Sequence, residues 1–279
     1  MPMTARTAPS GAQVRTAGLL AGLFTLSAAA AAYEIVPASV TPLIRDSLGI
    51  GAAAAGLLVT VMYATSVVAS VPAGIALDRV GVVRSVVAAG VALLVAGAWG
   101  YAAGVAGAYW WVVASRVLGG LAYVVLWNAG ANLVGEAVTP QRRATAVGVF
   151  TASAPLGFAL GQFGGPRIAA VAGWPAVLPT FAGLAVVGMV IFLVTTHGYE
   201  FSVSAEVPDR AALVSLFTDR GVWTLCLLCF IAFDLYLVLN SWLPSYLSEG
   251  LGVGLALSGL LTAVFPAVGV VARTGGGVL

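Results

Sequence analysis

The feature that most constrains this chain is a long apolar run, Gly51 to Leu77, which contains no charged side chain. A helix needs about 20 consecutive apolar residues to cross the hydrocarbon core of a bilayer. The run is therefore long enough to span a membrane as one helix. It ends at Asp78 and Arg79, where the chain returns to water.

The composition extends this reading to the whole molecule. Hydrophobic residues make up 61% of the chain and charged residues 8%, which excludes an ordinary soluble domain. A net charge of +2 is too small to indicate nucleic acid as a partner. We therefore predict an all-α polytopic membrane protein that has the lipid bilayer as its surroundings.

Eight apolar runs are long enough to be spans. The first follows a polar, arginine-containing start, and a secretory signal cleaved within Ala28 to Ala32 is the alternative. We favour an uncut helix because the apolar run continues well past that point. The predicted spans are 17–44, 51–77, 84–106, 108–134, 144–170, 175–196, 221–247 and 255–279.

The arginines set the orientation. With the N-terminus in the cytoplasm, eight arginines lie in cytoplasmic segments and two, Arg45 and Arg167, in external ones. Cytoplasmic loops carry the excess of basic residues in membrane proteins. We therefore expect a multi-pass protein of the plasma membrane with a cytoplasmic N-terminus.

A repeat links the two ends of the chain. Between the segments 48–76 and 251–279, which are offset by 203 residues, 13 of 29 positions are identical. The repeat aligns the second span with the eighth, so it indicates duplication of a six-helix unit. We predict a six-helix half at 1–196, a cytoplasmic linker at 197–220 and the first two helices of an incomplete second half at 221–279. Two complete halves need about four more helices, so we expect a truncated chain.

Several short sequence motifs occur one after another along the chain. Gly74, Asp78, Arg79, Gly81 and Arg84 form G-x-x-x-D-R-x-G with a following cation, although Val82 and Val83 stand where further cations are usual. They are followed by Arg116 in R-x-x-x-G, by the glycine series Gly157, Gly161 and Gly165, and by the text SWLPSYL at 241–247.

In this order the patterns resemble the major facilitator superfamily, and the SWLPSYL text resembles its nitrate, cyanate and organic-anion branch. The resemblance implies a secondary transporter that works by alternating access between two six-helix halves. It also implies that the loop from Gly74 to Arg84 is a cytoplasmic gate. The alternative for this loop is a plain topology signal.

Ionisable residues inside spans are the candidates for the solute and ion pathway, because each costs about 2.5–3.5 kcal/mol at mid-membrane. Glu34 shares a helix face with Ser27, seven residues away. Asp234, in the seventh span, maps by the repeat to within one turn of Glu34. We expect both carboxylates to face one central cavity, although Asp234 could instead be a protonated acid bonded to a neighbouring helix.

Arg116 lies well inside the fourth span, with Tyr123 two turns further on the same face. Its guanidinium could bind an anion or set the charge of a nearby acid, and the resemblance associates this motif with proton coupling. A structural pair with Glu34 is the alternative. For Gly157, Gly161 and Gly165, spaced by four, we predict close helix packing.

The predicted function is therefore secondary transport of a small solute, coupled to protons, with a small organic or inorganic anion as the favoured substrate. The alternatives are a drug-type exporter and a truncated fragment that transports nothing. An enzyme is disfavoured because His197 is the single histidine. We expect no cofactor and no metal. The absence of lysine and of a phosphate-binding loop disfavours ATP-driven transport.

Overall fold

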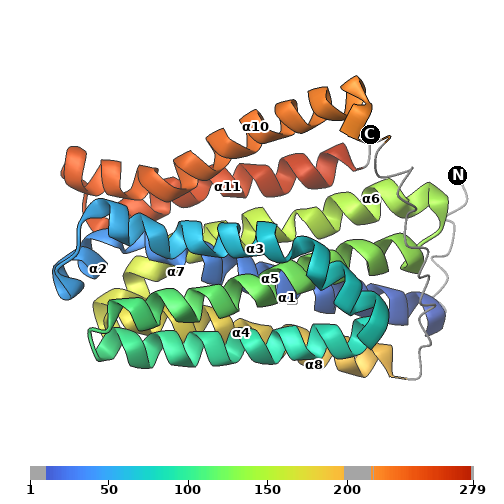
Figure 1. Cartoon of the computed structure of the whole chain (residues 1–279), viewed down its shortest axis with the longest axis horizontal. Helices are drawn as coiled ribbons and strands as arrows, with labels where there is room; N and C mark the ends of the chain where they lie inside the picture. Colours follow the sequence, from blue (N-terminus) through green and yellow to red (C-terminus); the bar gives the residue numbers. More distant parts are fainter. Residues whose placement is uncertain (1–10, 198–214, 216, 278–279) are drawn as a thin grey trace, which may run out of the picture.

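In the computed structural model, residues 11–197, 215 and 217–277 are described, and every regular element among them is helical (Figure 1). In chain order the elements are α1 (Gly11–Ser39), α2 (Thr41–Leu48), α3 (Ala52–Val80), α4 (Val82–Val105), α5 (Tyr109–Ala137), α6 (Pro140–Thr151), α7 (Ser153–Ala172), η1 (Trp174–Ala176), α8 (Val177–Thr196), α10 (Arg220–Ser245), η2 (Tyr246–Gly250) and α11 (Leu255–Gly276).

Eight helical stretches in the described part of the chain are long and apolar enough to cross a membrane. They coincide with the eight predicted spans, so the all-α polytopic fold is confirmed. The predicted linker, 197–220, falls mostly outside the described residues. The division into 1–196, 197–220 and 221–279 therefore stays a prediction.

The first span is not one helix to residue 44, as its apolar run suggested. α1 ends at Ser39, and α2 starts afresh at Thr41. Pro42 causes the break, because its ring has no N–H and clashes with the carbonyl four residues earlier. The Thr41 hydroxyl donates to the Pro37 carbonyl across the break, at 3.1 Å.

α1 is the central helix of the bundle. It packs most extensively against α7 and α8 and also touches α5. Every residue from Leu26 to Thr41 is buried, so a charged side chain in this stretch is inside the protein and not against lipid. This placement explains why Glu34 is the focus of the site described below.

α10 and α11 lie together along one face of that bundle (Figure 1). α11 packs against α7 along its length, whereas α10 touches α1 near one end only. On α10, Asn240 and Pro244 are buried, while the residues from Trp223 to Leu235 are exposed. α10 therefore meets the bundle near α2 and separates from it toward its own start at Arg220, as Figure 1 shows.

The two repeat copies agree in local structure. α3 begins at Ala52 and α11 at Leu255, which are related by the offset of 203 residues. The glycines at the preceding turns, Gly49 and Gly252, have φ angles of +63° and +68°. Positive φ is strained for residues with a Cβ, so the same glycine-dependent turn introduces both helices.

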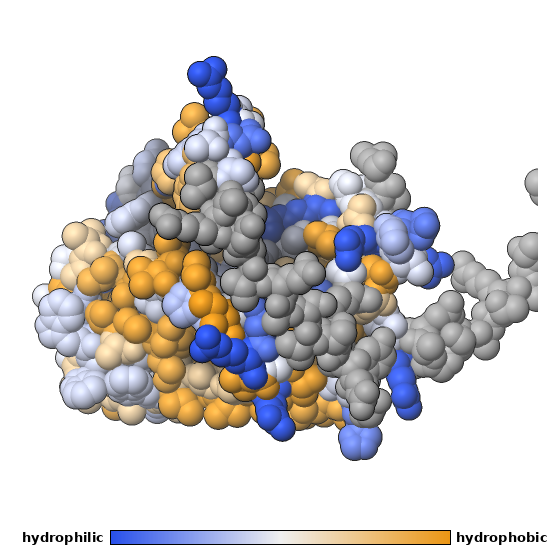
Figure 2. All heavy atoms as spheres, turned by 45° about the vertical axis from the view of Figure 1, so that its right-hand side comes forward, coloured by the Kyte–Doolittle hydropathy of each residue, from blue (hydrophilic) through white to orange (hydrophobic). Residues whose placement is uncertain are grey.

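The surface matches a protein in a bilayer. Figure 2 shows hydrophobic residues over much of the side of the bundle, and hydrophilic residues gathered around the end that is turned toward the viewer. The large exposed side chains include Val68, Val71 and Val171, each at least 70% exposed. Apolar side chains at this exposure are stable where lipid, and not water, is the neighbour.

Candidate functional site

Arg116 is fully buried on α5 and binds the backbone of two other helices. Its Nε donates to the Leu58 carbonyl at 2.8 Å and its Nη1 to the Tyr33 carbonyl at 2.6 Å. Its Nη2 donates to the backbone carbonyl of Glu34. The guanidinium carbon also lies 4.5 Å from the centre of the Tyr33 ring. Arg116 thus ties α5 to α1 and α3.

Glu34 is 0% exposed, and among the described residues neither carboxylate oxygen has a hydrogen bond of ordinary geometry, although the Tyr63 hydroxyl lies within reach of the carboxylate. The structural pair considered for Arg116 and Glu34 therefore exists, but it is made through the Glu34 backbone. The positive guanidinium is close to the carboxylate while the carboxylate oxygens stay unoccupied. Such a group can accept and release a proton or hold a cation.

Three tyrosines from three further helices surround Glu34. Tyr63 on α3 lies beside the carboxylate, and Tyr123 on α5 and Tyr236 on α10 are within electrostatic range of it. The hydroxyls of Tyr63 and Tyr236 are buried without a hydrogen-bond partner in the described part of the chain. We call Glu34 and these three tyrosines the central cluster. Its members come from both sides of the predicted linker.

The walls of the central cluster are aromatic. The Tyr123 ring stacks on Trp127 with centroids 6.2 Å apart, and the Tyr236 ring stacks on Phe158 at 5.7 Å. Tyr236 also contacts Phe265 of α11, at 5.3 Å. Flat aromatic walls beside the buried hydroxyls of Tyr63 and Tyr236 suit a small solute with a polar or charged end.

Arg273 on α11 belongs to this site, although the sequence motifs do not single it out. Its guanidinium carbon lies 5.9 Å from the Tyr236 ring centre, and its Nη1 donates to the Thr151 carbonyl at 2.8 Å. It is also within electrostatic range of Tyr123. The rule that singled out Arg116, an arginine inside an apolar span, identifies Arg273 equally well.

Asp234 does not join Glu34. It lies on the exposed stretch of α10 and has no ion pair or hydrogen bond to a described residue. The repeat placed Asp234 within one turn of the position equivalent to Glu34, but the side chain of Asp234 is on the exposed face of α10. Two positions further on, Tyr236 occupies the face that meets the bundle, so it is the α10 residue in the central cluster.

Ser27 is 2% exposed on α1, and its hydroxyl is without a partner among the described residues. It lies two turns from Glu34 on the same helix. The glycines predicted to pack do face α1: a Cβ at Gly157 would meet the Ala28 carbonyl, at Gly161 the Ala32 carbonyl and at Gly165 the Ser39 hydroxyl. These contacts hold α7 directly behind Glu34.

The predicted gating loop is at the turn between α3 and α4. Gly81, with φ of +90°, ends α3 by donating its N–H to the Leu77 carbonyl. Asp78, Arg79 and Arg84 are exposed there, and Gly74, one turn earlier, has open space at its Cβ position. The described residues contain no cluster of three or more His, Cys, Asp or Glu side chains able to hold a metal.

At the opposite end, the two parts of the chain are joined by polar contacts. Arg45 Nη1 of α2 pairs with Glu249 Oε2 of η2 at 2.6 Å. Gln162 Nε2 of α7 donates to the Asn240 carbonyl of α10, also at 2.6 Å. This end is closed, whereas the first half of α10 stands away from the bundle at the other end.

Comparisons with known proteins agree with this arrangement. A sequence profile described as Major Facilitator Superfamily matches residues 11–279. A "Nitrite extrusion protein" of Bacillus subtilis is 29% identical over 124 residues, which is 44% of this chain and 31% of that protein. A "Probable 4-methylmuconolactone transporter" of Cupriavidus pinatubonensis is 28% identical over 225 residues, which is 75% of this chain and 50% of that protein.

A solved D-xylose-proton symporter has the same fold, with a TM-score of 0.58 at 14% identity over 92% of this chain and 67% of that structure. The chain thus spans between about a third and a half of the length of the two curated relatives it matches.

Proposed function

Because this chain belongs to the Major Facilitator Superfamily, we propose that it is a secondary transporter that moves a small anion across the plasma membrane by alternating access, coupled to protons. The names of the two curated relatives support a small solute, inorganic in one case and organic in the other. The name of the structural neighbour supports a proton as the coupling ion.

The observation that carries the proposal is the unpaired carboxylate of Glu34 at the centre of the bundle. It lies where α1, α3, α5 and α10 meet, so a solute in the central cluster contacts elements on both sides of the predicted linker. Carriers bind their substrates at such an interface near the middle of the membrane. Protonation of Glu34 would change the charge that the solute meets there.

Each neighbour then has a role. Arg116 is a positioning residue, because its donors hold the backbone at Tyr33, Glu34 and Leu58. Tyr63, Tyr123 and Tyr236 offer hydroxyls to the solute. Arg273 supplies the positive charge that an anion needs, since its guanidinium stays charged at physiological pH.

The gates follow from the two ends of the molecule. The Arg45–Glu249 ion pair holds the outer end closed, and the separation of α10 opens the inner end. We propose that the loop containing Asp78, Arg79 and Arg84 closes the inner end in the opposite state. This orientation rests on the arginine distribution, which puts the N-terminus in the cytoplasm.

The test is uptake by proteoliposomes containing the intact protein, with labelled nitrite, benzoate and xylose as probes. We expect uptake of nitrite or benzoate but not of xylose. Arg273→Gln should lower anion uptake at least tenfold, whereas Arg167→Gln, at an exposed site away from the cluster, should leave it unchanged. Equal uptake of xylose, or no effect of Arg273→Gln, would contradict an anion carrier.

A further inference from the structure

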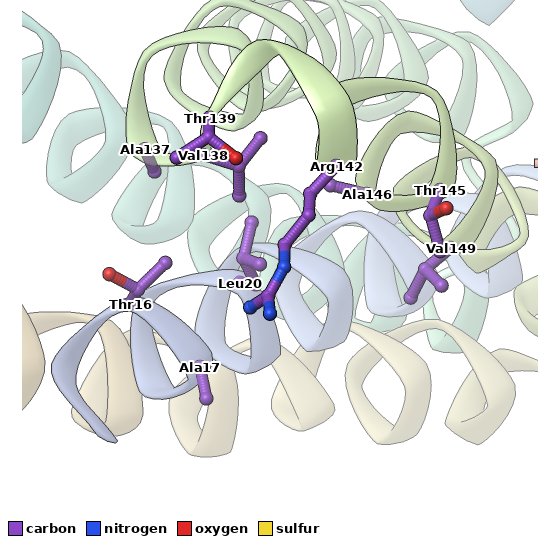
Figure 3. Close-up of a pocket in the computed structure, with 10 residues that line it drawn as sticks. All are labelled: Thr16, Ala17, Leu20, Ala137, Val138, Thr139, Arg142, Thr145, Ala146 and Val149. Atoms are coloured by element: carbon purple, nitrogen blue, oxygen red, sulfur yellow. The ribbon is translucent and has the colours of Figure 1, made fainter. Parts of the chain in front are cut away.

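A cavity of about 880 Å³ lies outside the central cluster. Three parts of the chain line it: the start of α1 at Thr16 to Leu20, the turn between α5 and α6 around Thr139, and one face of α6 from Arg142 to Val149 (Figure 3). The α5–α6 turn belongs to the end of the bundle that the arginine distribution places in the cytoplasm. The cavity is therefore at the depth of the inner membrane surface.

Among the described residues that line this cavity, Arg142 is the one ionisable residue. Figure 3 shows its side chain extending from α6 into the space between α6 and α1. No ion pair or hydrogen bond joins it to a described residue. The other described lining side chains are apolar or carry hydroxyls, so Arg142 is the one positive charge that the described part of the lining presents.

Arg143, the next residue, provides a contrast. Both arginines are exposed, but the Arg143 Nη2 and Nε donate to the Gly135 carbonyl at 2.7 and 3.2 Å, so its guanidinium is held against the end of α5. It does not line the cavity. Two adjacent arginines thus have different environments, and only the charge of Arg142 is directed into the cavity.

The cavity leads toward the central cluster. Val149 lines it, and the next residue, Phe150, packs on Trp127 with ring centroids 5.3 Å apart. Trp127 in turn stacks on Tyr123 of the central cluster. The Phe150 and Trp127 rings, here called the Phe150–Trp127 layer, therefore connect the wall of the cavity to the central cluster.

We propose that this cavity is a second binding site for the transported anion, in which Arg142 holds a small carboxylate or inorganic oxyanion at the cytoplasmic mouth of the path. The inference rests on the proposed anion transport. A cation that lines a concave surface raises the local concentration of anions there. The Phe150–Trp127 layer then separates this site from the central cluster, and the solute passes it when the layer moves.

The first test measures the cavity itself and needs no transport. Ala17, which lines the cavity from α1, is changed to Cys in a protein whose exposed Cys226 and Cys229 are Ser. Its labelling by an anionic methanethiosulfonate (sulfonatoethyl) is compared with that by a cationic one (trimethylammonium-ethyl). Each rate is normalised to the rate of the reagent with a free thiol.

In water, one positive charge at roughly 7 Å from the thiol raises the local concentration of the anionic reagent about threefold and lowers that of the cationic reagent about threefold. The anionic-to-cationic rate ratio should therefore fall about tenfold when the charge is removed. We expect this fall in Arg142→Gln but not in Arg143→Gln, which loses the same net charge. High salt should reduce the effect. An equal response of the two variants would overturn the proposal.

The second test identifies the occupant. Millimolar benzoate or nitrite should slow the anionic labelling of Ala17→Cys when Arg142 is present and not in Arg142→Gln. If neither anion protects, while vesicles rich in phosphatidylglycerol do so relative to phosphatidylcholine, the site binds a lipid headgroup and the proposal is wrong.

A transport measurement distinguishes failure of this inference from failure of the proposed function. Arg142→Gln should raise the half-saturating concentration on the cytoplasmic side about tenfold while Arg143→Gln does not. Wild-type transport with no difference between these variants would reject the second site alone. Absence of transport by the wild type would reject the proposed function.

Discussion

Arg116 binds Glu34 through the backbone carbonyl of Glu34 and not through its carboxylate. An arginine that neutralised the carboxylate would fix it as a permanent ion pair. Here the donors of Arg116 are used to hold three backbone carbonyls, and the side chain of Glu34 is left free. In this account Arg116 holds the backbone around the site in place, and Glu34 exchanges the proton.

This arrangement predicts that Arg116 is needed for stability. Arg116→Ala removes three hydrogen bonds from a buried charged donor, so we expect a loss of about 3 kcal/mol or more in the free energy of unfolding. For a chain of this size that lowers the melting temperature by about 5 °C or more. Thermal unfolding in detergent measures it.

Two further variants control this measurement. Arg116→Lys should recover little, because one ammonium group cannot reproduce the fork that reaches the three carbonyls. Arg167→Ala should change the free energy by less than about 0.5 kcal/mol, because Arg167 is exposed and its printed contacts, to the carbonyl and the ring of Phe163, are within its own helix. Normal stability of Arg116→Ala would contradict the positioning role.

The packing of α7 behind Glu34 predicts a difference between two glycines. A Cβ at Gly157 would meet the Ala28 carbonyl and lie 2.7 Å from the Ala31 Cβ, whereas a Cβ at Gly183 on α8 meets nothing within 4 Å. Gly157→Ala should therefore destabilise by about 1–3 kcal/mol. Gly183→Ala should be neutral or stabilise by up to about 1 kcal/mol, since alanine favours helix. Equal melting temperatures would show that α1 and α7 are not in close contact.

The Arg45–Glu249 pair predicts a shift of the gate with little effect on folding. Both side chains are partly exposed, at 32% and 43%, so the pair is worth roughly 0.2–1 kcal/mol. Glu249→Arg should raise the population open to the outside by about two- to fivefold. Ala55 is buried and lines a small cavity at this end with Trp242, so labelling of Ala55→Cys reports that population.

The swap of both charges, Arg45→Glu with Glu249→Arg, should restore slow labelling of Ala55→Cys. If the double variant labels as fast as Glu249→Arg, the ion pair does not hold the outer end closed. High salt should raise the labelling of the wild type toward that of the variant, because exposed ion pairs are screened.

The spans could be predicted from sequence because the length of an apolar run is a direct physical requirement of the bilayer. The repeat also carried local structure: Gly49 and Gly252 introduce α3 and α11 with the same positive φ. The break after Ser39 was not predicted as a helix end, because the apolar composition continues through it.

The faces of α10 could not be predicted from sequence. Asp234 and Tyr236 are two residues apart, about 200° around a helix, so one of them had to face away from the bundle. Both sides of α10 are apolar, and hydrophobic periodicity gives no direction in such a helix. Packing against Phe158 and Phe265 places Tyr236 inward. Arg273 was visible in the sequence, but only its contacts with Tyr236 and Thr151 relate it to the central cluster.

The most direct test of the account is anion accumulation driven by a proton gradient in proteoliposomes, compared between the wild type and Glu34→Gln. Glutamine keeps the size and polarity of the side chain but cannot carry a proton. We predict that Glu34→Gln loses at least tenfold of the gradient-driven accumulation of nitrite or benzoate, while exchange of the same anion without a gradient continues. Gradient-driven accumulation by Glu34→Gln at the wild-type rate would contradict the account.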